Sequence, residues 1–306
     1  MFRGVIDAAP AWRQGTSDMP LRPDPSPAEA LLARETQLRY GRVPTELDGV
    51  KVAEDGHFLS GDAYLLRSDG LSILYRKGKG VTVEHGPDAD ISAESLWLNG
   101  SVYAAIASIN GFKPIHASAV AYQGQVVAFT GPSGAGKSTL IAALGKLGLP
   151  MFCDDTLVLD LSDPARIICL PGHKRLKLTP EALALTGTEG QEKVGVTIDK
   201  FYALPPSGEV GEPLPLGRLV FLEDGPDLAA REITGADRFT RLSDDHYTEA
   251  LFASARRLDR AAQFVLQARL AQQIPMTQLT RPRDRLQFAA SALLAAKLVR
   301  NEEKSA

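Results

Sequence analysis

A glycine-rich segment from Gly131 to Ser138 has the residue types and spacing of a phosphate-binding loop, or P-loop. It reads GPSGAGKS and satisfies the pattern GxxxxGK[ST]. Its glycines let the backbone curl around an anion, so that successive N–H groups point at phosphate oxygens. The Lys137 ammonium reaches the β- and γ-phosphates, and the Ser138 hydroxyl is a ligand for magnesium. We therefore predict that ATP and Mg²⁺ bind through Gly131, Ser133, Gly134, Ala135, Gly136, Lys137, Ser138 and Thr139.

The elements around this segment favour a P-loop over an incidental glycine-rich turn. An apolar strand is expected before it, over residues 126–130, and a helix over about 137–147 follows it. The positive N-terminal end of that helix adds to the attraction for phosphate. Another strand is expected over about 150–153. The order strand, loop, helix, strand is the core of a P-loop fold.

Two adjacent carboxylates, Asp154 and Asp155, follow the second of these strands. Alone, such a pair is more often a turn or a helix cap. Strand ends on the loop side of a parallel sheet, however, face the same crevice as the P-loop. One of the two can hold magnesium beside Ser138, directly or through water, and the other can accept a hydroxyl proton. The sequence thus predicts transfer of the terminal phosphate to a hydroxyl.

Three segments in this order resemble the HPr serine kinase/phosphorylase family. They are the HASAV of residues 116–120, the loop of residues 131–139 and the Cys-Asp-Asp of residues 153–155. The interval of 18 positions between Lys137 and Asp155 also fits the family pattern. A lone strand histidine usually packs or faces solvent, but the resemblance implies that His116 is catalytic and lies near the transferred phosphate. It also implies that Asp155 is the proton acceptor, that Ser138 and Asp154 bind magnesium, and that Lys137 is a catalytic, phosphate-binding residue.

Farther along the chain, residues 172–177 read GHKRLK, where the bifunctional enzymes of that family carry a magnesium-binding glutamate. This departure favours kinase over phosphorylase chemistry. The chain also resembles HPr kinase-related proteins of bacterial biosynthetic clusters, including lasso-peptide precursor kinases, in its length and in the LKLTPE of residues 176–181. That resemblance implies a serine acceptor on a peptide or small protein, such as the C-terminal serine of a lasso-type precursor peptide.

A basic cluster lies in the same stretch, and it has two interpretations. Such a run is usually a solvated face. It could instead neutralise phosphate or hold a substrate carboxylate, which gives the substrate-binding candidates Lys174, Arg175 and Lys177. The Arg281-Pro282-Arg283 segment is expected to be structural.

Two other functions are compatible with the P-loop. The first is a kinase for the hydroxyl of a small metabolite. The second is a regulatory or assembly protein that binds the nucleotide without phosphotransfer. Asp155 favours a kinase, because a protein that only binds nucleotide needs no positioned base.

The composition limits the partners. The 306 residues have a formal charge of −3, which argues against non-specific nucleic-acid binding. No apolar run approaches the ~20 residues that span a bilayer, and the first 27 residues do not have the pattern of a signal peptide. With only two cysteines, we expect a cytoplasmic protein without a membrane partner. A homo-oligomer is compatible with the sequence.

The expected fold class is α/β, with a smaller β-rich domain before a P-loop kinase core that resembles the C-terminal domain of HPr kinase. Gly and Asp turns predict an antiparallel meander, followed by a helix that Ser92 caps and that runs to about Asn110. A mobile segment is expected at about 205–215, with helices over about 245–273 and 283–300. The predicted parts are a poorly ordered lead-in (1–34), the β-rich domain (35–110) and the kinase domain with C-terminal helices (111–306).

Overall fold

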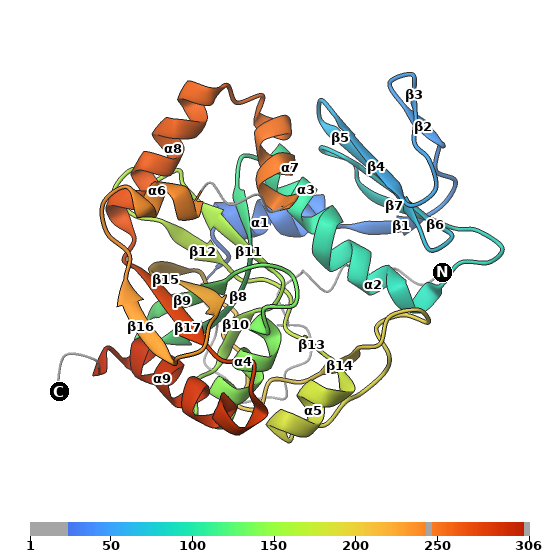
Figure 1. Ribbon diagram of the computed structural model, residues 1–306. Coiled ribbons are helices and arrows are strands. Elements are labelled where there is room, and N and C mark those ends of the chain that lie inside the picture. The colour runs from blue at the N-terminus through green and yellow to red at the C-terminus, as the bar shows by residue number, and fades with distance from the viewer. Residues whose placement is uncertain (1–23, 243–246, 303–306) are drawn as a thin grey trace.

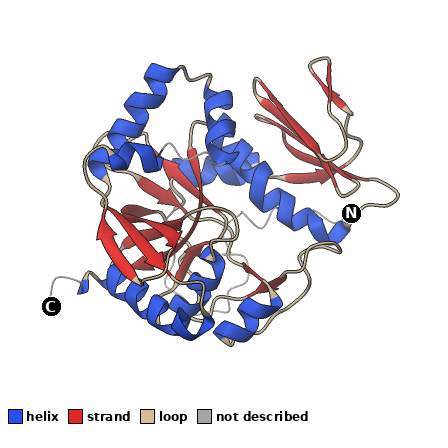
Figure 2. Ribbon diagram, viewed as in Figure 1, coloured by secondary structure: helices blue, strands red, loops and turns tan. Residues whose placement is uncertain are grey.

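The structure is a computed structural model that describes residues 24–242 and 247–302. These residues form a mixed α/β fold with an eight-stranded sheet, a five-stranded sheet and two small two-stranded sheets (Figure 1). Helices cover the large sheet and connect it to the five-stranded one (Figure 2). Every helix within the described residues is too short or too polar to cross a bilayer.

Helix α1 (Pro27–Glu35) precedes the first sheet. Ser26 and Glu29 form a reciprocal capping box: the Glu29 N–H donates to Ser26 Oγ at 3.3 Å, and the Ser26 N–H donates to Glu29 Oε2 at 2.9 Å. Residues 27–34 of the predicted poorly ordered lead-in (1–34) therefore belong to a capped helix. Residues 1–23 lie outside the described residues.

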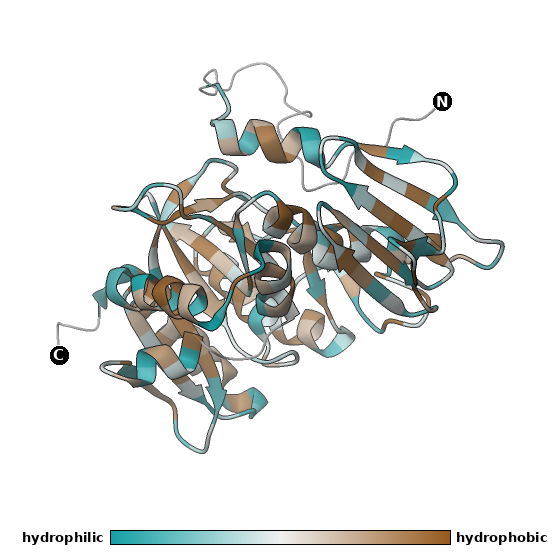
Figure 3. Cartoon of the chain, turned by 90° about the horizontal axis from the view of Figure 1, so that it is seen from above, coloured by the Kyte–Doolittle hydropathy of each residue, from teal (hydrophilic) through white to brown (hydrophobic). Residues whose placement is uncertain are grey.

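The five-stranded sheet has the order β1-β7-β6-β5-β4. Strands β4 to β7 form the predicted antiparallel meander, and β1 pairs with β7 in parallel. Figure 3 shows brown, apolar segments along these strands and teal, polar residues at their turns. The strands, with a separate small hairpin of β2 and β3, are β1 (Leu38–Tyr40), β2 (Glu46–Leu47), β3 (Val50–Lys51), β4 (Gly56–Ser60), β5 (Ala63–Ser68), β6 (Leu71–Arg76) and β7 (Gly80–His85).

A helical segment leads from this sheet to the next, but it is not the single helix that the sequence predicts. It begins after Asp90, whose carboxylate accepts the Ser92 N–H at 3.0 Å, so Asp90 rather than Ser92 is the cap. It is interrupted at Gly100, where φ is −99° and ψ is −106°. Its parts are η1 (Ile91–Ala93), α2 (Glu94–Trp97), the π-type turn η2 (Leu98–Val102) and α3 (Tyr103–Ile109).

In the large sheet, the P-loop strand β9 (Gln125–Thr130) lies between β8 (Lys113–Tyr122) and β15 (Leu214–Asp224). β8 and β9 form the predicted hairpin, with Gln123 and Gly124 at φ values of 47° and 72°. β15 is parallel to β9, and β17 (Met276–Arg281) is parallel to β15. β16 (Ala229–Glu232) forms the outer edge.

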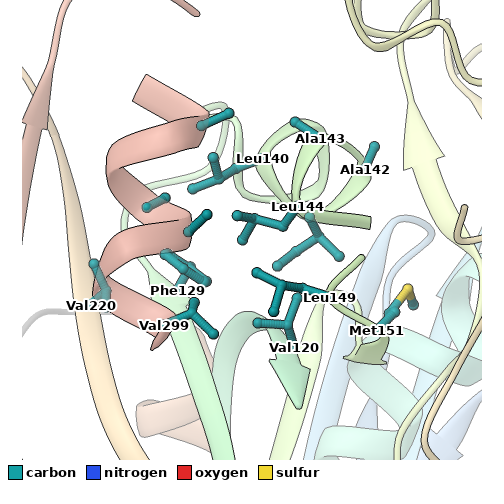
Figure 4. Packing of buried hydrophobic residues seen from close by; sticks show 14 of the residues in the cluster. Val120, Phe129, Leu140, Ala142, Ala143, Leu144, Leu149, Met151, Val220 and Val299 are labelled. Atoms are coloured by element: carbon teal, nitrogen blue, oxygen red, sulfur yellow. The ribbon is translucent and has the colours of Figure 1, made fainter. Parts of the chain in front are cut away.

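The side chains of the central strands alternate between two cores. Val127 and Phe129 face one side of the sheet, where α4 (Lys137–Lys146) and α9 (Phe288–Arg300) pack. Figure 4 shows Leu140 and Leu144 of α4 meeting Phe129 and Val299 in this core. Ala128 faces the opposite core, to which α8 (Arg260–Gln273) contributes. The loop between β9 and α4 is thus held by burial on both sides.

The strand that carries the Asp pair does not lie directly beside β9, as a parallel P-loop sheet would have it. β10 (Met151–Cys153) and β11 (Thr156–Asp160) both pair antiparallel with β8, which separates them from β9. Residues 151–160 therefore follow β8 as one interrupted strand. The Asp pair lies at the interruption rather than at a strand end. Since β8 is antiparallel to β9 and to β10, these two strands still run in the same direction.

The remaining elements lie partly where the sequence predicts a mobile segment and long helices. The Val210 N–H donates to Met151 O at 2.9 Å, so the expected mobile segment is hydrogen-bonded to β10. The long helix expected to end at 273 is broken at Arg257, where φ is 49°, and the start predicted at 245 lies outside the described residues. These elements are β12 (Ile168–Leu170), β13 (Leu176–Leu178), α5 (Pro180–Thr186), β14 (Phe201–Ala203), α6 (Asp237–Leu242), α7 (Tyr247–Arg256) and η3 (Arg285–Gln287).

The hydrophobic cores do not separate at residue 111, where the kinase domain is predicted to begin. One buried cluster combines the N-terminal sheet and α3 with Val158, Leu170 and Leu251 from later in the chain. Whether the two parts behave as separate domains therefore stays a prediction.

Candidate active site

The P-loop connects β9 to α4 and has the backbone that its glycines allow. Gly134 and Gly136 have φ values of 81° and 79°, in the left-handed region that favours glycine. A Cβ atom on Gly136 would also lie 2.8 Å from Nη2 of Arg281. The backbone angle thus favours glycine at this position, and a larger residue would displace the end of the Arg281 side chain.

The Lys137 side chain is folded into the loop. Its Nζ donates to Gly131 O at 2.8 Å and to Pro132 O at 3.1 Å, and it is 6% exposed. Burial lowers the pKa of Lys137 to about 8, although Asp154 and Asp155 oppose this shift. The two loop carbonyls give the Lys137 ammonium only partial negative charge, and a bound phosphate would give it a full counter-charge.

Asp154 is buried and accepts hydrogen bonds from the hydroxyl groups of two serines. Ser138 Oγ donates to Asp154 Oδ1 at 2.8 Å, and Ser118 Oγ donates to the same oxygen at 2.5 Å. The Lys177 N–H donates to Asp154 Oδ2 at 3.2 Å. A hydroxyl and a carboxylate oxygen are hard donors that suit Mg²⁺, which keeps several water ligands and also binds phosphate oxygens. Ser138 and Asp154 therefore fit the predicted magnesium pair.

Asp155 is oriented differently from its neighbour. Its Oδ2 accepts from Lys177 Nζ at 2.6 Å, and its Oδ1 lies 3.5 Å from His116 Nδ1. Burial raises the pKa of Asp155, but the charges of Lys177 and His116 outweigh it and hold the pKa at about 2. The same ion pair raises the pKa of Lys177 above its ordinary value, against the effect of burial. Asp155 is therefore a carboxylate at neutral pH.

The backbone at Asp155 is strained. Its φ is 74°, a left-handed value that non-glycine residues rarely adopt, and the Thr156 N–H donates to Asp154 O at 3.0 Å across it. Strained backbone of this kind concentrates at functional sites, where the surrounding structure enforces it. Here the turn directs the two neighbouring carboxylates to different partners.

His116 lies on β8, opposite Thr156 of β11. Its Nδ1 donates to the Asp155 carbonyl at 3.0 Å, which places the ring beside the Asp pair, where the resemblance to HPr kinases implies it should be. His116, Lys137, Ser138, Asp154 and Asp155 thus lie together. Their catalytic and metal-binding roles remain predictions.

The three cationic candidates Lys174, Arg175 and Lys177 do not act as one cluster. Lys174 Nζ is buried and donates to the carbonyls of Phe152 and Val210. The Arg175 guanidinium pairs with Glu192 and lies 4.1 Å from the centre of the Tyr202 ring. Only Lys177 reaches the aspartates.

Three neighbours of the Asp pair are absent from the sequence-based prediction. A Cβ on Gly100 would lie 3.4 Å from Asp155 Oδ2, so the interrupted helix forms a wall of the site. His173 is buried, and neither of its ring nitrogens has a hydrogen-bond partner among the described residues. Burial, followed by the charges of Lys177 and Arg175, lowers its pKa to about 3, so the ring is neutral. Ser118, the third, could have been found, because it shares a strand face with His116 at a spacing of two.

Comparisons with known proteins add little to this geometry. No family model and no curated protein matches the chain. Among solved structures, the HPr(Ser) kinase/phosphatase from Coxiella burnetii is similar, with 16% identity over 62% of this chain and 95% of that chain. The TM-score is 0.33, which is too low for the likeness to carry an inference. A functional assignment therefore has to rest on the residues of this chain.

Proposed function

We propose that the protein is a magnesium-dependent kinase that transfers the γ-phosphate of ATP to a hydroxyl group. The observation that carries this proposal is that the two aspartates have different partners. Asp154 accepts from Ser138 of the P-loop, whereas Asp155 is held ionised by Lys177 next to the same loop. One carboxylate is thus arranged for a cation at the phosphates and the other for an acceptor hydroxyl.

In the proposed reaction, the acceptor oxygen forms a bond to the γ-phosphorus while the bond from that phosphorus to the bridging oxygen of ADP breaks. Asp155 orients the hydroxyl and takes its proton. A carboxylate of low pKa suits this role, because proton transfer comes late in a loose transition state. Lys137 and the loop neutralise charge on the transferring group. Magnesium held by Ser138 and Asp154 would add positive charge at the β- and γ-phosphates.

We propose a serine of a peptide or small protein as the acceptor, following the resemblance to kinases of biosynthetic clusters. Of the three basic candidates, Lys177 alone could bind a terminal carboxylate of the acceptor. Lys174 donates to backbone carbonyls, and Arg175 pairs with Glu192. Lys177 is itself paired with Asp155. We therefore expect the site to bind the acceptor through its hydroxyl rather than through its carboxylate.

Labelled ATP and magnesium should be incubated with the protein and with serine peptides encoded beside its gene, each as the free acid and as the amide. Phosphoserine formation by the wild type, and its loss in Asp155→Asn, would support the proposal. If a small alcohol is phosphorylated and no peptide is, the acceptor class is wrong. If ATP binds and Asp155→Asn changes neither binding nor turnover, the kinase mechanism is wrong.

A further inference from the structure

A cavity of about 240 Å³ lies beside the P-loop, and its lining includes neither Ser138 nor the two aspartates. It is bounded by the loop, by α5 and by the segment between β17 and α9. In Figure 1, α5 and α9 flank α4 at the bottom of the molecule, and both contact it. The lining includes apolar side chains (Ala182, Leu185 and Phe288) and polar ones (Thr139, Glu181 and Asp224).

One buried cation in this lining, Arg281, forms no ion pair with a carboxylate of residues 24–242 and 247–302. It is 9% exposed and donates to Ala135 O in the P-loop, and the charge of Asp224 acts on it from beyond ion-pair distance. By contrast, Arg283 pairs with Asp224 at 2.6 Å, and Arg285 pairs with Glu181 at 2.8 Å. A buried cation that forms no ion pair is costly, so the position of Arg281 beside a phosphate loop points to an anionic ligand.

The direction of the phosphate chain follows from two consecutive residues. Ser138 faces Asp154, which places the magnesium end of the nucleotide at the aspartates. Thr139 is turned by about 100° around the axis of α4, and it lines the cavity. A triphosphate that begins at the aspartates and follows the loop would therefore bring its other end to the cavity. Leu185, which is 36% exposed, and Phe288 offer apolar surface there for a flat base.

We propose that this cavity binds the nucleoside of the triphosphate, with Arg281 contacting the phosphate that joins it. Leu185 and Phe288 would pack against the base, and the carboxylates of Glu181 and Asp224 would accept from ribose hydroxyls or base amino groups. This inference rests on the proposed function, since it assumes that the P-loop holds the phosphates. It reassigns Arg281, which the sequence alone suggests is structural, to nucleotide binding.

The test compares magnesium–ATP with magnesium–tripolyphosphate, an inorganic probe that has the phosphates and no nucleoside. We expect the wild type to bind ATP more tightly by about tenfold or more, the size of a base-stacking contribution. Phe288→Ala should remove most of that difference while leaving tripolyphosphate affinity unchanged. Leu185→Asn, at a more exposed position that does not threaten folding, should act in the same direction. Leu293→Ala, on the same helix but outside the cavity and 53% exposed, is the control.

Arg281→Gln should weaken both ligands, and Arg281→Lys should recover part of the loss. Equal affinity of the wild type for the two ligands would overturn the nucleoside site and leave the P-loop assignment intact. Equal losses for both ligands in Phe288→Ala and Leu185→Asn would also overturn it. If neither ligand binds the wild type, the proposed function fails as well.

Discussion

Lys177 Nζ lies 2.6 Å from Asp155 Oδ2, and the two residues reach each other from β13 and from the interruption between β10 and β11. Both side chains are largely buried. The pair therefore does more than neutralise charge: it keeps the candidate proton acceptor ionised where burial alone would favour its neutral form. Lys177 thus holds the pKa of Asp155 below its ordinary value.

The two aspartates should be separable by mutation. Asp155→Asn keeps the shape and removes the proton acceptor, so ATP should still bind while transfer falls by ~10²-fold or more. Asp154→Asn should instead weaken magnesium binding, so that transfer requires a higher magnesium concentration, because Asp154 is the partner of Ser138. Calorimetry and single-turnover transfer, each over a range of magnesium concentrations, would distinguish the two. Identical behaviour of both variants would contradict the division of roles.

Removing the Lys177 charge should change the pH dependence of transfer. The pKa of Asp155 is about 2 because Lys177 and His116 outweigh burial. A carboxylate must be ionised to accept a proton, so activity is lost as the pH falls through this pKa. In Lys177→Met the pKa rises, and the acid limb of kcat should move to higher pH. Lys51→Met, a change at an exposed position of the β2–β3 hairpin, is the control. An unmoved acid limb would refute the role of the ion pair.

ATP binding should be accompanied by proton uptake above neutral pH. Burial lowers the pKa of Lys137 to about 8, so at about pH 9 most of the free protein carries a neutral amine. Phosphate stabilises the ammonium, raises this pKa and draws a proton from solution. Calorimetry in buffers of different ionisation enthalpy measures the uptake. Lys137→Arg, which stays charged, should show none if it still binds. An uptake of the same size in that variant would place the titrating group elsewhere.

Gly136→Ala should abolish nucleotide binding through a contact and not through backbone strain alone. The new Cβ would lie 2.8 Å from Arg281 Nη2. Gly148→Ala is a matched control, because Gly148 has a φ of 83° and open space around its Cβ position. Both changes should lower the free energy of unfolding by ~1 kcal/mol or more, the usual cost of left-handed backbone. Only the first should lose ATP affinity. Equal affinities in the two folded variants would show that Arg281 does not constrain the loop.

The parts of the site that lie in contiguous residues could be predicted from the sequence. The P-loop has its chemistry in one segment, and the Asp pair follows it at a short interval, so the expected proximity of Ser138 and Asp154 matches the structure. The basic cluster shows the limit. Lys174, Arg175 and Lys177 lie within four positions, yet only the pairing of β13 and the packing around it bring Lys177 to Asp155. Which of the three basic residues contacts Asp155 depends on the tertiary structure, so no local sequence pattern indicates it.

The fold has a similar limit. The hairpin of β8 and β9 and the meander were predictable, because their turns carry Gly, Asp and Gln at left-handed angles. β17 was not predicted, because it reads MTQLTR and has little apolar character for a strand inside a sheet. Gly100 reaches Asp155 from a helix that the sequence shows only as a continuous one. Contacts between distant segments of this kind depend on the assembled fold.

The position of β9 has a consequence for how the protein is made. β8 and β9 are neighbours in the chain and can pair as soon as both have emerged from the ribosome. The other edge of β9 stays open until β15 arrives, and Ala135 lacks its Arg281 partner until β17 joins β15. An open edge of this kind invites pairing with other chains. The strand next to the P-loop is therefore open to pairing with other chains until the residues of β15 have been synthesised, and the loop lacks its Arg281 contact until those of β17 have been.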